Sequence, residues 1–221
     1  MTNIDLMLFD MDGTLIDSRA DLARSINLML QELGRPSLAE DTIAAFVGDG
    51  VRVLVYRSLT ATDPNGRPPD DYLHADGIAL MHKHYAEQMF VSTVLYPNIA
   101  GTMKYFAGKR KAVVTSKEVR FARLILERFG ISDDFNVIVG GDTVAERKPH
   151  PAPVLEAINQ LGGSVAQALM IGDSENDINA GRRAGCRTCA VTYGFRSADQ
   201  LRKVSPDLMI DRFEELKDFF S

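Results

Sequence analysis

The sequence predicts an α/β fold, in which a Rossmann-like parallel sheet core carries an inserted helical domain. Short apolar runs that end at polar residues or glycine alternate with helical patterns in the second half of the chain, which is typical of βαβ units. One more such run, Leu6 to Phe9, stands near the start and is followed by a helical pattern without a strand signal. We therefore expect a core domain of residues 1–15 and 91–221 and a helical insertion of residues 16–90.

Composition and charge restrict the class of protein. Of the 221 residues, 45% are hydrophobic and 25% are charged, which is ordinary for a globular protein. A net charge of -5 offers no basic surface for nucleic acid, and we expect neither a membrane span nor a signal peptide. Cys186 and Cys189 have C-x-x-C spacing without a second pair, so we expect reduced packing residues. The reduced cysteines favour a cytoplasmic protein. We expect a monomer or a homodimer.

Apolar residues at helical spacing predict four helices in the insertion. Ser18 is a suitable N-cap for the first helix, with Asp21 three positions later, and Gly34 ends its pattern. His82 and His84 belong to the last helix and are expected on its exposed face. The expected helices cover residues 18–33, 40–47, 51–59 and 71–89.

The core domain is expected to contain six strands joined by helices, and therefore a parallel sheet. The expected strands are residues 5–9, 112–114, 137–139, 168–171, 189–191 and 208–210. Helical patterns between them cover residues 99–107, 119–129, 151–161 and 176–184.

Two carboxylates follow the first strand directly, Asp10 and Asp12. An open α/β sheet binds its ligands at the carboxyl ends of the strands. Carboxylates this close repel each other, and burial without a partner would cost several kcal/mol. A hard cation such as Mg²⁺ would resolve that conflict. Taken alone, D-x-D-G-T could also be a simple turn between a strand and a helix.

Other strand ends carry groups that suit a phosphate and a metal ion. Thr115 and Ser116 follow the second strand and precede a helix, where backbone N–H groups favour an anion. Lys148 follows the third strand, and the fourth is followed by three acidic residues, Asp173, Glu175 and Asp177. An aspartate aligned with phosphorus can act as a nucleophile, while a second carboxyl group transfers protons. The set therefore predicts phosphoryl transfer, which depends on positioning and charge neutralisation.

Four motifs carry a family resemblance that covers nearly the whole chain. They occur in the order DMDGT (residues 10–14), VVTSK (113–117), RKPHP (147–151) and IGDSENDINAGRRAG (171–185). The chain resembles the haloacid dehalogenase superfamily, and within it the phosphoglycolate phosphatase-like group. The helical insertion resembles the C1-type cap of that family.

The resemblance implies a role for each motif residue. Asp10 matches the nucleophile, and Asp12 matches the general acid and base, which also offers its backbone carbonyl to Mg²⁺. Thr115 and Lys148 match the phosphate-binding residues, and we add Ser116 to this group. The implied metal residues are Asp10, Asp12 and Asp173, with support from Asp177, Gly13 and Thr14.

Three segments support or qualify the choice of subfamily. Residues 46–55, FVGDGVRVLV, resemble the glycine-containing cap motif of phosphoglycolate phosphatases. Residues 95–103, LYPNIAGTM, resemble the return to the core, although Asn98 replaces the usual glycine. Relatives usually have asparagine where Ser116 stands, which leaves the substrate class less well defined.

The sequence thus predicts a Mg²⁺-dependent phosphatase for a small anionic phosphate monoester, with 2-phosphoglycolate as the best guess. A pyrophosphatase, a sugar-phosphate phosphatase or a β-phosphoglucomutase-like phosphotransferase would share the core and differ in the cap. A dehalogenase would dispense with Asp12 and with magnesium. A non-enzymatic phosphate-binding protein is the alternative from another class, and phosphate release from an aryl phosphate would exclude it.

Overall fold

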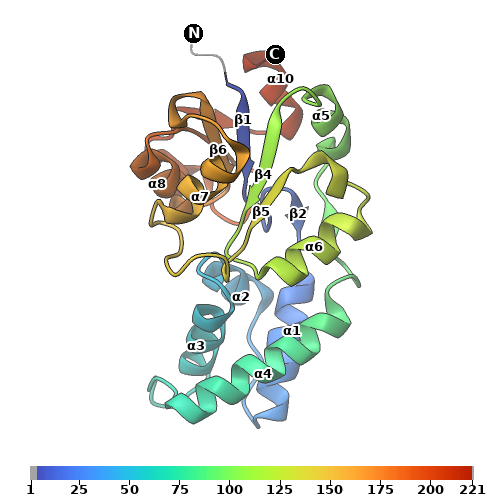
Figure 1. The fold of residues 1–221 in the computed structure, drawn as a ribbon. Helices are drawn as coiled ribbons and strands as arrows, with labels where there is room; N and C mark the ends of the chain where they lie inside the picture. The colour runs from blue at the N-terminus through green and yellow to red at the C-terminus, as the bar shows by residue number, and fades with distance from the viewer. Residues whose placement is uncertain (1–3, 221) are drawn as a thin grey trace. The chain divides into compact units, whose positions relative to one another are not determined.

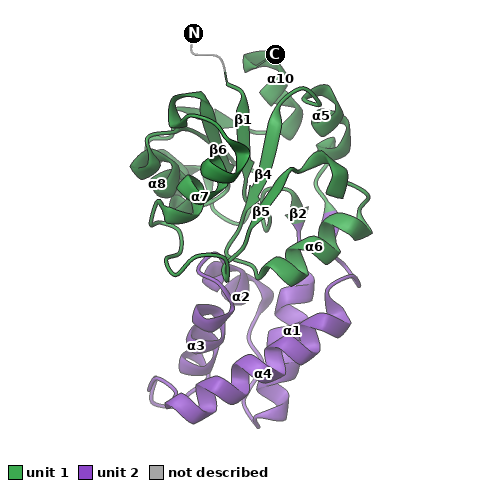
Figure 2. Cartoon of the chain, in the orientation of Figure 1, with its two compact units in different colours: residues 1–16, 95–221 green, residues 17–94 purple. Residues whose placement is uncertain are grey.

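The computed structural model describes residues 4–220, and the chain forms two compact units (Figure 2). Unit 1 comprises residues 1–16 and 95–221, and unit 2 comprises residues 17–94. The sequence placed these divisions after residues 15 and 90.

Unit 1 contains a six-stranded sheet with the strand order β5-β4-β1-β6-β7-β8, visible in part in Figure 1. All neighbouring strands are parallel, which confirms the predicted α/β class. The strands are β1 (Leu6–Phe9), β4 (Arg110–Val114), β5 (Val137–Val139), β6 (Ala168–Gly172), β7 (Arg187–Val191) and β8 (Leu208–Ile210).

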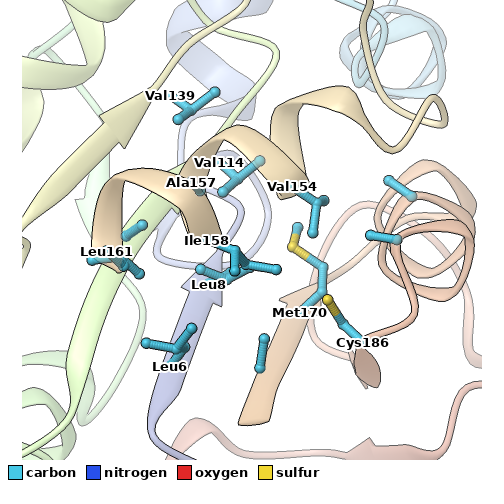
Figure 3. Close-up of a cluster of buried hydrophobic side chains, with 14 residues drawn as sticks. Leu6, Leu8, Val114, Val139, Val154, Ala157, Ile158, Leu161, Met170 and Cys186 are labelled. Carbon is cyan, nitrogen blue, oxygen red and sulfur yellow. The ribbon is translucent and has the colours of Figure 1, made fainter. Parts of the chain in front are cut away.

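The central strand β1 is buried on both faces, as its uninterrupted apolar sequence predicts. Leu6 and Leu8 belong to an apolar cluster that includes Val154, Ala157 and Ile158 of α7, shown in Figure 3. Phe9 is the neighbour of Leu8 in the strand, so its side chain points to the opposite face of the sheet. There its ring contacts the rings of Phe135 and Phe213.

The α-helices of unit 1 are α5 (Ile99–Tyr105), α6 (Val119–Arg128), α7 (Ala152–Leu161), α8 (Glu175–Ala184), α9 (Ala198–Lys203) and α10 (Leu216–Phe219). Short 3-10 turns are η1 (Ser132–Asp134), η2 (Val165–Gln167) and η3 (Phe213–Glu215). Helices α9 and α10 were not predicted, because helices this short show too little periodicity to be recognised. Cys189 lies in β7 and Cys186 just before it, and both are free and buried, as predicted.

Unit 2 consists of the helices α1 (Arg19–Glu32), α2 (Glu40–Phe46), α3 (Val51–Ala61) and α4 (Asp71–Gln88). Two short strands, β2 (Ile16–Asp17) and β3 (Val94–Leu95), pair with each other where the chain passes between the units. The sequence did not predict these strands, since two residues show no alternation. Among the described residues, no helix is long and apolar enough to cross a membrane.

Ser18 is the N-cap residue of α1, as predicted, but the expected capping hydrogen bonds do not form. The Ser18 side chain makes no capping hydrogen bond to α1. Asp21 is fully buried, and its carboxylate accepts hydrogen bonds from the backbone N–H groups of Ser92 and Thr93 and from the Thr93 hydroxyl. The Asp21 carboxylate thus takes its hydrogen bonds from residues 92 and 93, distant in sequence, and not from the start of its own helix.

The expected exposure of His84 is wrong, and His82 is half-buried. His84 is buried, and its Nε2 lies 2.9 Å from a Glu32 carboxylate oxygen. Lys83, between the two histidines, is exposed and donates to the same oxygen. Helices α1 and α4 pack against each other in unit 2, so the face of α4 that carries Met81, His84 and Tyr85 is covered.

Candidate active site

Three adjacent strands bring the predicted site residues together. In the sheet, β1 lies between β4 and β6, with Phe9 opposite Val113 on one side and Ile171 on the other. Asp10 follows β1, Thr115 follows β4 and Asp173 follows β6. The carboxyl ends of parallel neighbours share one edge of the sheet, so these residues meet although they are far apart in the chain.

A cluster of three buried carboxylates lies at this edge. Oxygen atoms of Asp10, Asp173 and Asp177 all lie within 4.8 Å of one another. The three residues expose only 8%, 3% and 0% of their surface. The sequence predicted Asp10 and Asp173 for the metal and Asp177 as their support, whereas the Asp12 carboxylate is not a member of this cluster.

Burial makes the ionised forms of Asp10 and Asp173 costly. Burial, together with the charge of Asp177, raises the pKa of Asp10 from 3.8 to about 7. Burial and the charges of Asp177 and Asp10 raise the pKa of Asp173 well above 3.8. These carboxylate oxygens lie close together, and their negative charges repel each other. A hard divalent cation would bind them and supply the missing positive charge.

Lys148 contacts two members of the carboxylate cluster. It is almost fully buried, and its Nζ lies 2.9 Å from Asp10 Oδ1 and 2.5 Å from Asp177 Oδ1. It also donates to the backbone carbonyl of Val114 at 2.7 Å. Burial alone would lower the pKa of Lys148, but the charges of Asp10 and Asp177 raise it above its ordinary value. The three N–H groups of this ammonium therefore all have acceptors within the protein.

Asp177 hydrogen-bonds both to Lys148 and to the first turn of α8. Its Oδ1 accepts from Lys148. Its Oδ2 accepts from the backbone N–H of Ser174 at 3.1 Å and from the Ser174 hydroxyl at 2.6 Å. The same carboxylate thus caps the first turn of α8 and holds the lysine.

Asp12 is paired with Lys117, which was not predicted as a site residue. Lys117 Nζ lies 3.1 Å from Asp12 Oδ2, and both side chains are largely buried. Lys117 is the last residue of the VVTSK motif, so its place beside the predicted phosphate-binding hydroxyls was the available signal.

One hydroxyl group of the site has a hydrogen-bond partner and two have none among the described residues. Thr115 Oγ1 accepts from the backbone N–H of Lys117 at 3.2 Å. The hydroxyl oxygens of Thr14 and Ser116 are buried, and neither has a hydrogen-bond partner among the described residues. Buried hydroxyls without a partner are costly, so these two are suited to bind a polar ligand.

Gly13 allows close approach to Asp173. Its φ is +83°, a conformation that favours glycine, and a Cβ on it would lie 2.1 Å from Asp173 Oδ2. The glycine of the DMDGT motif is thus required both by the turn and by the neighbouring carboxylate.

The loop after β7 also reaches the site, and the sequence analysis missed it. Phe195 donates its backbone N–H to Asp173 Oδ2 at 2.7 Å. Arg196 pairs with Glu175 at 3.6 Å, and Glu175 is outside the carboxylate cluster. The available signal was the glycine-containing segment TYGF, residues 192–195, because this segment directly follows a predicted strand, as the DMDGT motif does.

Comparisons with known proteins agree with this geometry. The family model for haloacid dehalogenase-like hydrolases matches residues 7–191. The phosphoglycolate phosphatase of Psychrobacter arcticus is 39% identical over 219 residues, which are 97% of this chain and 94% of that protein. The phosphoglycolate phosphatase of Colwellia psychrerythraea is 36% identical over 214 residues, with 96% and 95% covered. The crystal structure of a predicted phosphoglycolate phosphatase from Haemophilus somnus has a TM-score of 0.93 to this chain, with 32% identity and 99% of both chains covered. The chain therefore belongs to the haloacid dehalogenase-like hydrolases, and in sequence it is phosphoglycolate phosphatase-like.

Proposed function

We propose that this phosphoric monoester hydrolase cleaves a small anionic phosphate monoester through an aspartyl-phosphate on Asp10. The observation that carries the proposal is the meeting of Asp10 and Asp173, at the ends of the adjacent strands β1 and β6, with Lys148 from the segment between β5 and α7. The names of the relatives favour 2-phosphoglycolate as the substrate.

In the first step, a carboxylate oxygen of Asp10 attacks phosphorus and the bond from phosphorus to the ester oxygen breaks. Asp12 gives its proton to the departing oxygen, so the leaving group is a neutral alcohol. In the second step, water attacks the phosphorus of the aspartyl-phosphate and Asp12 takes a proton from that water. The products are inorganic phosphate and the restored Asp10 carboxylate.

The remaining residues position the phosphoryl group. Thr115 and Lys148 bind its oxygens, and the unpartnered hydroxyl of Ser116 is suited to the same purpose. Since every N–H of Lys148 already has an acceptor, phosphate would compete with Asp10, Asp177 or the Val114 carbonyl for this ammonium.

Asp10 and Asp173, with Asp12 through its backbone carbonyl, would hold Mg²⁺, whose charge stabilises the developing negative charge when it is bound. Asp177, Gly13 and Thr14 support this arrangement. By the same resemblance, unit 2 corresponds to a C1-type cap. The reduced, buried cysteines support a cytoplasmic location.

A burst experiment tests the two-step mechanism. An aryl phosphate such as p-nitrophenyl phosphate has a good leaving group, so its first step needs little help from Asp12. Asp12→Asn should release about one p-nitrophenol per enzyme and then stop, because the aspartyl-phosphate is not hydrolysed. Hydroxylamine, which attacks acyl phosphates, should then release the phosphate. Asp10→Asn should show no burst, and near-normal turnover by Asp10→Asn would refute the mechanism.

The substrate requires a separate measurement. We expect kcat/KM for 2-phosphoglycolate to exceed that for neutral alkyl phosphates, sugar phosphates and pyrophosphate, with activity lost in EDTA. Transfer of the phosphoryl group to a hexose phosphate instead of water would indicate a phosphotransferase.

A further inference from the structure

Four residues after β7 contact several parts of the site, although none of the motifs contains them. These residues, Tyr193, Gly194, Phe195 and Arg196, are called here the 193–196 loop. Strand β7 lies next to β6 in the sheet, so the loop begins at the same edge as Asp173. Its contacts are directed at Asp173 and at the turn of the DMDGT motif.

The backbone of the loop binds the Asp173 carboxylate. The Phe195 N–H donates to Asp173 Oδ2 at 2.7 Å. A carboxylate has two oxygens, so a hydrogen bond that fixes one of them also sets the direction of the other. The bond therefore determines how Asp173 is presented to a metal ion.

Gly194 allows this approach because it has no side chain. A Cβ on Gly194 would lie 2.3 Å from Asp173 Cβ, 2.4 Å from the Gly13 carbonyl oxygen and 2.5 Å from Asp173 Oδ2. Since Gly13 approaches the same Oδ2, Asp173 is held between two glycines from distant parts of the chain. Any larger residue at position 194 would displace the loop, Asp173 or the Gly13 turn.

Tyr193 connects the loop to the DMDGT turn. Its hydroxyl donates to the Thr14 backbone carbonyl at 2.8 Å, and its ring centroid lies 4.6 Å from that of Tyr96. The turn that carries Asp12 and Gly13 and the loop that binds Asp173 are thus joined directly.

We propose that the 193–196 loop positions the Asp173 carboxylate for Mg²⁺, with Gly194 and the Phe195 backbone N–H as its positioning elements. The proposal rests on the proposed metal site. Groups that hydrogen-bond to a metal ligand set its orientation, and their loss typically weakens metal binding by about 10- to 100-fold.

The first test is Mg²⁺ affinity measured by isothermal titration calorimetry, together with the rise in Tm on adding Mg²⁺. Gly194→Ala should raise the Kd by about tenfold or more and reduce the rise in Tm. Gly108→Ala is the control, because a Cβ there meets nothing within 4 Å. The control should bind Mg²⁺ like the wild type.

Two further comparisons keep the test decisive if Gly194→Ala does not fold. Phe195→Pro removes the N–H donor, whereas Phe195→Leu keeps it, so only the proline variant should lose affinity. Tyr193→Phe keeps the ring and removes one hydrogen bond, and it should raise the Kd by about threefold or more. Wild-type affinity in the folded variants Gly194→Ala, Phe195→Pro or Tyr193→Phe would overturn the proposal. Failure of the wild type to bind Mg²⁺ would instead refute the metal site of the proposed function.

Discussion

At the carboxyl edge of the sheet, three carboxylates and an ammonium lie buried together, whereas the buried side chains that pack between the sheet and α7 are apolar. Burial stabilises the apolar layer around α7, at about 25 cal/mol per Å² removed from water. Burial opposes ionisation at the edge, as the raised pKa of Asp10 shows. The strand interiors thus supply stability that offsets the cost of the charged groups at their ends.

Removal of the buried cation should produce the largest loss of stability. Lys148→Met leaves Asp10 and Asp177 without their ammonium partner, and breaking a buried ion pair typically costs about 3–5 kcal/mol. We expect a loss of this size in urea unfolding at pH 8 in EDTA, and loss of phosphatase activity in a separate assay with Mg²⁺.

Lys111 provides the matched control for Lys148. It is equally buried, but its ammonium donates to the backbone carbonyls of Phe106 and Lys109. Lys111→Met should therefore cost only about 1–2 kcal/mol, because it leaves carbonyl groups and no carboxylate unsatisfied. Equal losses for the two variants would mean that charge compensation is not what Lys148 contributes.

Truncation in the apolar layer should affect stability without affecting chemistry. Ile158→Ala on α7 removes a buried side chain and should lower the free energy of unfolding by about 2–4 kcal/mol, with kcat within about twofold of wild type. Leu155→Ala on the same helix is 41% exposed and should cost less than about 0.5 kcal/mol. A large fall in kcat at 25 °C for Ile158→Ala would show that the layer and the edge are coupled.

Titration of Asp10 should give a smaller, pH-dependent effect. Its pKa is about 7 in the folded protein and 3.8 as the ordinary value, so the folded state binds more protons between these values. Stability from this group is therefore present at low pH and is lost as pH rises to about 7, by roughly 1–4 kcal/mol. In EDTA, Asp10→Asn should gain stability relative to wild type between pH 4.5 and pH 8. A difference that does not change with pH would contradict the raised pKa.

The sequence predicted the core well because burial leaves a pattern. The strands at residues 137–139 and 208–210 have the predicted bounds, and the other predicted core strands differ by at most two residues at an end. The strand order was not predicted, yet it is what makes β4, β1 and β6 neighbours. Apolar runs show that a strand is buried and say nothing of which strand lies beside it.

Partners of the polar residues were the hardest to predict. The pairing of Lys117 with Asp12 and the hydrogen bonds of Asp21 depend on segments distant in sequence. The 193–196 loop was missed because its contribution is a backbone N–H and the absence of a Cβ. Neither of these contributions comes from a polar side chain that could be recognised in the sequence.

The short pair of β2 with β3 has a consequence for how this chain tolerates change. The Tyr96 backbone N–H donates to the Leu15 carbonyl at 3.1 Å, so the polypeptide leaves unit 1 and re-enters it at adjacent points. Unit 2 is therefore an insertion whose two ends lie side by side, like the ends of a short loop. The entropy cost of bringing these ends together depends only weakly on the length of the insertion. Unit 2 could therefore be replaced by an insertion of another length while the strand ends that carry the site residues stay in place.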